Sequence, residues 1–306
     1  MIKSRSFKTR FYSVLLSATI LSACGSSNNR LIPFDAVEAQ RLTSASAPAE
    51  EVADQVARAA AIGPNIDRLA VSTLHGETDN PALETFAVPG VCTGTTCVFT
   101  EPTTTISVEI NTENLLDTED DVGSVRAVLT RNGITLLEGS GGERGRDYRV
   151  YGAWMEHAGF AVETRHETER ENIKITYRGG QAVGDSTGDA PSADATYHGV
   201  MVGTPATGDN SDDILQGDAR LVYAFDTYSI DVHFENIKNL DRNADHSVTE
   251  ITFEDIVVID NTYSVEHNDQ MLSGAFVGPA HAETAGVFEK DGVVGAFGAK
   301  KIGPSN

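Results

Sequence analysis

Apolar and polar residues alternate over the last third of the chain, from Thr196 to Lys301. Leu221, Tyr223 and Phe225 place apolar side chains on one face of a predicted strand. After a short turn a second strand repeats the pattern, with Tyr228, Ile230, Val232 and Phe234 on one face and Ser229, Asp231, His233 and Glu235 on the other. Successive strand residues point to opposite faces, so this pattern is typical of half-buried antiparallel strands. Repeated glycines suit bent strands, and we predict a small closed barrel.

The segment 64–180 is predicted to be a second, smaller β-rich unit. Its expected strands are 66–74, 105–110, 125–131, 133–137, 148–154, 159–164 and 172–177. Asn132-Gly133 between two alternating segments is a strong hairpin signal. We expect Trp154, the only tryptophan, in the core, because a large aromatic side chain in a strand usually packs inward.

The remaining segments are predicted as a short helix and a linker, in an architecture that is otherwise all-β. Residues 47–63 are predicted as a short helix, with Glu50 and Glu51 in its first turn and Gly63-Pro64 at its end. Residues 181–195 are rich in Gly, Asp, Ser and Pro, and we interpret them as a linker. The barrel domain is then expected over 196–302.

Residues 1–23 have the features of a secretory signal peptide. Four basic residues precede an apolar core, Phe11 to Leu21, which is too short for a stable membrane span. Leu21-Ser22-Ala23-Cys24-Gly25 resembles a bacterial lipobox. This predicts that Cys24 is lipidated, although an ordinary signal peptide with an incidental cysteine is the alternative. Several acyl chains would anchor the protein stably, through a flexible tether over 24–46.

The residues after Cys24 favour the outer membrane, because Gly25 and Ser26 follow the cysteine rather than aspartate. We predict an outer-membrane, lipid-anchored protein at the cell surface. Exposure to the periplasm rather than to the outside is left open by these residues.

The chain is strongly acidic. Its 306 residues carry a net charge of −22, and loss of the four basic residues in the signal segment leaves −26. Such a charge repels phosphate backbones, so nucleic acid is excluded as a partner. A solvated surface, a basic partner or attraction of cations all remain compatible with it.

Cys92 and Cys97 are close in the sequence, in what should be an oxidising compartment. A disulfide is favoured over a metal site, since no further Cys or His clusters nearby. The pair is expected at a hairpin tip between Phe86–Val88 and Val98–Phe99, where it would hold an exposed loop in one shape.

The end of the chain carries a specific order of motifs. It reads Gly274-Ala-Phe276-Val-Gly-Pro279, then Glu283-Thr-Ala-Gly-Val-Phe288, then Gly295-Ala-Phe-Gly-Ala-Lys300. This order resembles the C-terminal signature of the transferrin-binding protein B family of barrel domains, surface lipoproteins that also include factor H binding protein and haem-capturing proteins of the hemophilin type. Val277, Ala285 and Lys301 depart from the usual pattern.

The resemblance covers about a third of the chain. It implies an eight-stranded barrel on a lipid-anchored surface binding protein, with the variable, ligand-binding part upstream. No transferrin-contacting motif is recognisable, so the ligand does not carry over.

Three further motifs are candidates for chemistry. Gly184-Asp-Ser186-Thr-Gly188 fits a nucleophile elbow, but a loop precedes it, so a linker is the better interpretation. The segment from Asp241 to Ser247 begins like a calcium loop but lacks its Gly and Glu, which favours a polar hairpin loop. His157, in an aromatic patch, is the candidate haem contact, with an exposed histidine at a strand end as the default.

These observations favour a non-enzymatic binding protein. We find no catalytic centre, metal site or cofactor in the sequence. The expected ligands are a host or environmental protein, or a haem or iron carrier that feeds a TonB-dependent receptor. A surface-lipoprotein translocator is a further expected partner. The alternative is a structural or export-handle envelope lipoprotein without a dedicated ligand.

Overall fold

The computed structural model describes residues 49–62, 69–72, 75–78, 86–87, 91–93, 96–100, 105–109, 126–143, 146–168, 174–267 and 270–303. All of them belong to the larger of two compact units, Ile32–Asn306. The predicted signal peptide, Cys24 and the predicted tether lie outside the described residues. Within these residues, no helix is long and apolar enough to cross a membrane.

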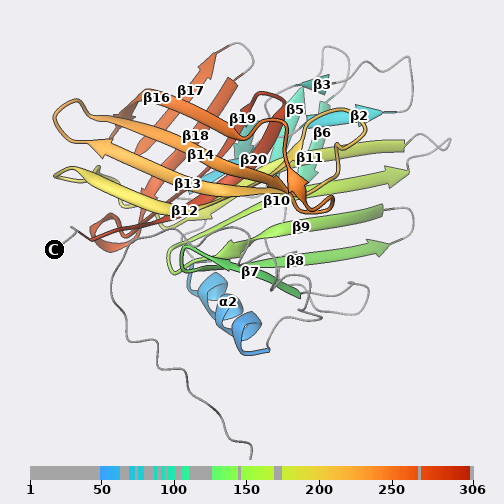
Figure 1. The fold of residues 1–306 in the computed structure, drawn as a ribbon, viewed down its shortest axis with the longest axis horizontal. Helices are drawn as coiled ribbons and strands as arrows, with labels where there is room; N and C mark the ends of the chain where they lie inside the picture. Colours follow the sequence, from blue (N-terminus) through green and yellow to red (C-terminus); the bar gives the residue numbers. More distant parts are fainter. Residues whose placement is uncertain are drawn as a thin grey trace, which may run out of the picture. The chain divides into compact units, whose positions relative to one another are not determined.

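The C-terminal part is a closed antiparallel barrel (Figure 1). Its eight strands pair in sequence order, and β12 closes the ring by pairing with both β13 and β20. They are β12 (Ala195–Pro205), β13 (Leu215–Ala224), β14 (Ser229–Asn239), β16 (Glu250–Ile259), β17 (Thr262–His267), β18 (Gln270–Val277), β19 (Glu283–Lys290) and β20 (Val293–Lys301). Strand β15 (Ala244–Asp245) adds to β14, and the 3₁₀ helix η4 (Pro279–His281) joins β18 to β19. The predicted eight-stranded antiparallel barrel is confirmed.

The barrel interior is packed with large apolar side chains. The largest, all fully buried, are Tyr197, Tyr223, Phe234, Tyr263, Phe276, Phe288 and Phe297. The ring centroids of Phe234 and Phe288 are 4.5 Å apart, and those of Tyr223 and Phe276 are 5.5 Å apart. Since close-packed rings occupy the lumen, a ligand must meet the barrel on its outside or at its ends.

The upstream part forms a second sheet, in the order β3-β2-β11-β10-β9-β8-β7, with β1 also paired to β11. Its strands are β1 (Leu69–Ser72), β2 (His75–Thr78), β3 (Phe86–Ala87), β7 (Arg126–Arg131), β8 (Ile134–Glu143), β9 (Arg146–Trp154), β10 (Ala158–Thr168) and β11 (Lys174–Gly184). A small third sheet contains β4 (Val91–Thr93), β5 (Thr96–Thr100) and β6 (Thr105–Glu109). The smaller β-rich part preceding the barrel is thereby confirmed.

Both faces of the upstream sheet are covered in part. One face packs on the outer wall of the barrel through a mixed cluster that includes Phe160, Val162, Val200, Val202, Val277, Val287 and Ala296. The other face carries Trp154, Val150 and Val183, which pack with Ile62 of helix α2 (Ala49–Ile62). Because Trp154 is 2% exposed, its predicted place in the core is confirmed.

Several local predictions are confirmed by the strand register. Asn132 and Gly133, with φ of 49° and 73°, form the turn between β7 and β8, and Arg131 pairs with Ile134. Two positive φ values are what this kind of hairpin turn requires, and Asn-Gly meets the requirement. The predicted helix 47–63 is observed as Ala49–Ile62.

The linker and one apolar position of the barrel were predicted incorrectly. The first four residues of the predicted linker 181–195 belong to β11, because they pair with β10 and β1. Tyr228 does not continue the inward row of β14. It has φ of 51° in the preceding turn and its side chain is 52% exposed.

Candidate binding surface

The outer wall of the barrel has two different halves. The upstream sheet covers outward residues of β12, β18, β19 and β20. Strands β14 and β16 instead carry outward polar and charged side chains that are half-buried or exposed. This solvent-facing part of the wall is where a partner can approach the barrel.

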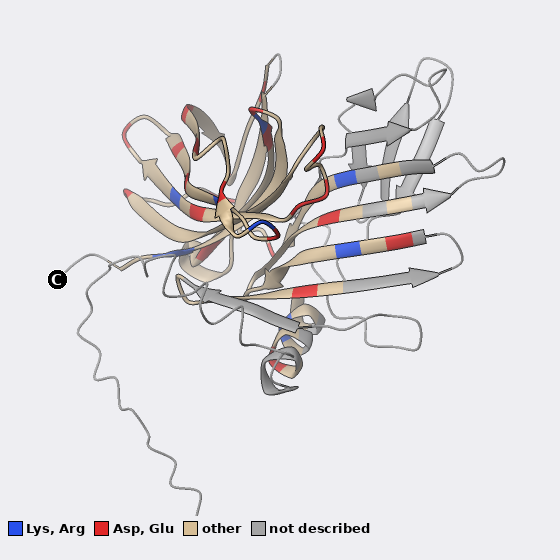
Figure 2. Ribbon diagram, turned by 45° about the vertical axis from the view of Figure 1, so that its right-hand side comes forward, with Lys and Arg blue, Asp and Glu red and all other residues tan. Residues whose placement is uncertain are grey.

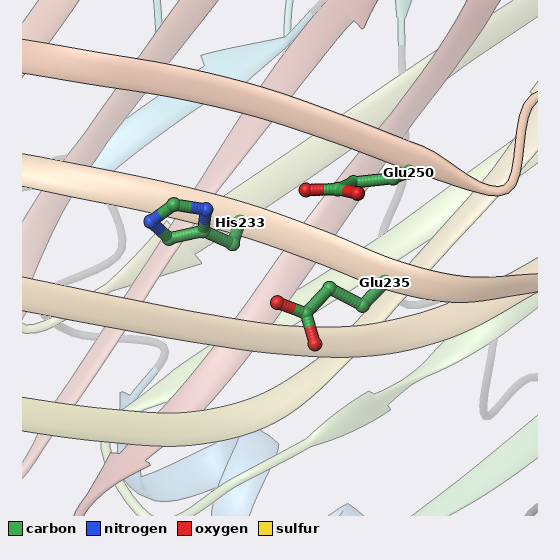
Figure 3. Close-up of side chains that lie close together, drawn as sticks. All are labelled: His233, Glu235 and Glu250. Carbon is green, nitrogen blue, oxygen red and sulfur yellow. The ribbon is translucent and has the colours of Figure 1, made fainter.

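Three potential metal ligands converge on the solvent-facing wall. His233 and Glu235 are two residues apart on β14, and Glu250 lies directly opposite Glu235 on β16. Figure 3 shows both carboxylates pointing toward the imidazole of His233. One ligand atom from each residue lies within 4.8 Å of the other two. Arg220 Nη2 is 3.8 Å from a Glu235 oxygen, so one cation already lies at the rim of this group.

The same wall exposes large apolar side chains where β14 and β16 meet the β13–β14 turn. Tyr228, Val257 and Ile259 are 52%, 61% and 66% exposed. Val258 N donates to Tyr228 O, and the rings of Phe225 and Tyr228 are 5.4 Å apart. We call Tyr228, Val257 and Ile259 the apolar patch.

The apolar patch lies in a strongly acidic part of the chain. No lysine or arginine occurs between Arg242 and Lys290 in the sequence. Figure 2 shows many acidic and few basic positions along the barrel strands and loops. Exposed carboxylates near the patch in sequence are Asp226, Glu254, Asp255 and Asp260. An apolar centre with an acidic surround is complementary to a protein surface with basic residues.

His157 lies where the upstream sheet meets the barrel. Its backbone N–H donates to Glu283 at 2.8 Å, and the Glu156 N–H donates to the other carboxylate oxygen at 3.1 Å. The His157 ring packs over Gly278, where an added Cβ would lie 2.3 Å from it. This packing gives the half-buried side chain a structural role, and the haem contact stays a prediction.

The buried carboxyl of Glu283 should make stability depend on pH. Burial raises the pKa of Glu283, while hydrogen bonds from His157 and Glu156 oppose the rise. A carboxyl with a raised folded-state pKa binds more protons in the folded than in the unfolded state. Its contribution to the free energy of unfolding is therefore complete at low pH and is lost as the pH rises above about 4.5.

As pH rises from 4 to 7, we expect the free energy of unfolding of Glu283→Gln to increase relative to that of the wild type. Urea denaturation at a series of pH values measures it. Glu254→Gln, at an exposed position of β16, is the control. A difference independent of pH would contradict the assignment.

Ser186 is not placed as a nucleophile. It forms a β-bridge to Val277, and its Oγ accepts a hydrogen bond from the Asn261 amide. An amide donor cannot accept the serine proton as a general base would. The segment around Ser186 instead attaches to the barrel, since Gly278 N donates to Asp185 O at 3.0 Å.

Asp241 is used in an ion pair. Its carboxylate accepts two hydrogen bonds from Arg149 of β9, at 2.7 and 2.8 Å, and one from the backbone N–H of Ile214. Asp245, in the two-residue strand β15, pairs with Lys238. These carboxylates are engaged by cations of the protein, which agrees with a polar loop.

The two remaining cysteines oppose each other in a hairpin. Cys92 of β4 and Cys97 of β5 are direct partners in the register, whereas the hairpin was expected to begin at Phe86–Val88. Opposed residues of an antiparallel pair have Cα atoms about 4.5–5.5 Å apart, within the range a disulfide spans. Their side chains lie outside the described residues, and the disulfide stays a prediction.

The convergence of His233, Glu235 and Glu250 was not predicted from the sequence. The group contains one histidine, so it has no pair of histidines at metal-ligand spacing. The detectable signal was the two-residue spacing of His233 and Glu235, which places both on one face of a strand. The position of Glu250 depends on which strand pairs with β14, and on its register.

Neither a protein-family model nor the sequence of a curated protein matches this chain. The solved structures that are similar to it include three for which the similarity covers 76% of the chain. Transferrin-binding protein B of Neisseria meningitidis has 16% identity and a TM-score of 0.36, and that of Haemophilus parasuis has 14% and 0.35. The N-lobe of lactoferrin-binding protein B of Moraxella bovis has 13% and 0.34.

The match covers less than half of the first two structures, 44% and 45%, and 99% of the N-lobe structure. The eight-stranded antiparallel barrel of this chain has the form that the C-terminal motifs predict, a transferrin-binding protein B-like barrel domain.

Proposed function

We propose that this chain is a non-enzymatic binding protein, anchored to the outer membrane by lipid at Cys24 and exposed at the cell surface. The observation that carries the binding role is the exposed apolar patch on a barrel whose lumen is filled. Large apolar side chains that stay exposed on a rigid wall are typical of interaction sites. The lipobox-like segment ending at Cys24 supports the anchor.

The partner is a protein with a basic surface. Carboxylates near the patch attract such a surface during encounter and fix the orientation of the partner. The apolar side chains supply contact area. Loops of the upstream sheet offer a second place for ligands, including a haem or iron carrier, as the family resemblance implies. A TonB-dependent receptor would then accept the cargo, and a translocator would export the protein.

Lysines placed in the apolar patch should abolish binding. Immobilised mature protein is expected to retain basic proteins from serum-containing growth medium, and less of them as salt increases. Val257→Lys/Ile259→Lys should reduce retention at least about tenfold, because lysines would be buried against a basic partner. Quantitative mass spectrometry of the retained proteins measures this.

The control is Thr207→Lys/Asn210→Lys, which adds the same charge to exposed positions in the β12–β13 loop, at the other end of β13. Equal loss in both variants would mean general charge attraction rather than a site. Retention of nothing by the wild type would contradict the binding function and favour the structural or export role.

A further inference from the structure

We propose that His233, Glu235 and Glu250 form a binding site for a divalent transition metal ion, with zinc as the best-matched ion. This site does not depend on the protein partner proposed above. One imidazole and two carboxylates converge on the outer wall of the barrel (Figure 3). Among the described residues, this is the group of three or more such side chains whose ligand atoms come together.

The strand ladder holds the three residues in place. His233 pairs with Thr252 and Glu235 pairs with Glu250, so the three side chains leave the same face of two neighbouring strands. Ligand atoms in a tetrahedral zinc site are about 3.3–3.6 Å from one another, given metal–ligand bonds of about 2.0–2.2 Å. In this structure the ligand atoms lie within 4.8 Å of one another. Rotation of the side chains can bring them to the shorter separation, since all three are at least partly exposed.

The arrangement also has an electrostatic reason to attract a cation. Glu235 and Glu250 are directly opposed across the ladder, where like charges destabilise a sheet. Arg220 offsets part of this repulsion from 3.8 Å, at 40% exposure. A divalent ion between the carboxylates would remove the repulsion more completely than this exposed guanidinium can.

Thr252 can orient the histidine. Its Oγ1 lies 3.5 Å from His233 Nδ1 and 3.3 Å from a Glu250 oxygen. A hydroxyl in this position can accept a hydrogen bond from Nδ1–H and donate one to Glu250, which leaves the lone pair of Nε2 for a metal. Metal-binding histidines commonly use their second nitrogen in such a hydrogen bond.

The donor set selects the class of ion. Calcium and magnesium prefer six or more oxygen ligands, whereas an imidazole with two carboxylates suits zinc and its neighbours in the first transition row. Three protein ligands leave a fourth tetrahedral position open. Because the group faces solvent, that position is accessible to water or to a donor atom of a partner.

Isothermal titration of zinc into the mature protein, without a polyhistidine tag, tests the proposal. We expect one saturable zinc ion per chain, no comparable saturation by calcium, and at least about tenfold weaker binding in each of His233→Ala, Glu235→Gln and Glu250→Gln. Cobalt bound in place of zinc should show visible absorption typical of a tetrahedral site.

Matched controls lie on β17. Glu266→Gln and His267→Ala make the same chemical changes at exposed positions outside the group, and zinc affinity should change less than about twofold. Circular dichroism of the metal-free variants checks that all remain folded. Equal losses in site and control variants, or no saturable zinc binding by the wild type, would overturn the proposal.

Discussion

Gly180→Ala is expected to destabilise the protein by about 3 kcal/mol, although it adds a single methyl group. Gly180 of β11 faces Gly295 of β20, and a Cβ built on it would lie 1.9 Å from the Gly295 carbonyl oxygen. The obstacle is backbone of another strand, which cannot rotate away as a side chain can. The upstream sheet and the barrel would have to separate locally and lose packing on both sides.

Chemical denaturation of Gly180→Ala and of the control Gly303→Ala measures the effect. A Cβ on Gly303 meets no atom within 4 Å, so we expect that variant to unfold like the wild type. Equal stability of Gly180→Ala and the wild type would contradict the close approach of the two strands.

A second close contact, between Gly298 of β20 and Phe160 of β10, allows the same interface to be tested with a double mutant. A Cβ on Gly298 would lie 2.3 Å from the ring of Phe160, which packs on it from β10. Gly298→Ala should therefore be costly in the wild type and nearly neutral in a Phe160→Ala background. This non-additivity is the result expected of residues in direct contact.

Arg149→Met is expected to lower the free energy of unfolding by about 2–3 kcal/mol. Arg149 of β9 donates to Glu138 at 2.7 Å and to Asp241 of the barrel at 2.7 and 2.8 Å. Burial opposes the charge of Arg149, but these two carboxylates outweigh it and raise the pKa of the guanidinium. Methionine keeps much of the apolar stem and removes the positive charge beside Glu138, whose side chain is 4% exposed.

Two comparisons identify the cause of that loss. Glu138→Gln in the Arg149→Met background should recover part of the stability, because it removes the buried negative charge. Arg242→Met breaks the ion pair to Asp213 at the surface, where Arg242 is 53% exposed, and should cost under about 1 kcal/mol. Similar losses for Arg149→Met and Arg242→Met would contradict a special role for the buried pair.

Local patterns were sufficient to predict much of the fold. The alternation from Leu221 to Phe234 identified the strands and, for all but Phe225 and Tyr228, the inward rows of β13 and β14. Asn132-Gly133 identified its turn, because its backbone conformation depends on those two residues themselves. Tyr228 was misplaced because it lies in the turn before β14, where its positive φ takes its side chain out of the inward row, and an apolar side chain does not reveal this.

The candidate site was less predictable. His233 and Glu235 were visible on one face of a strand, but Glu250 joins them through a pairing register that depends on the whole closed ring. Likewise, residues 181–184 have the composition of a linker and become strand because β10 and β1 supply their hydrogen-bonding partners.

The sequence by itself determined the strands, the turns, the barrel motifs and the acidic charge, because each depends on residues that are neighbours along the chain. Only the tertiary structure decided which wall of the barrel is covered, which apolar residues stay exposed, and which carboxylates lie beside His233. The physical reason is that these features come from contacts between strands far apart in sequence, set by register and packing rather than by local composition.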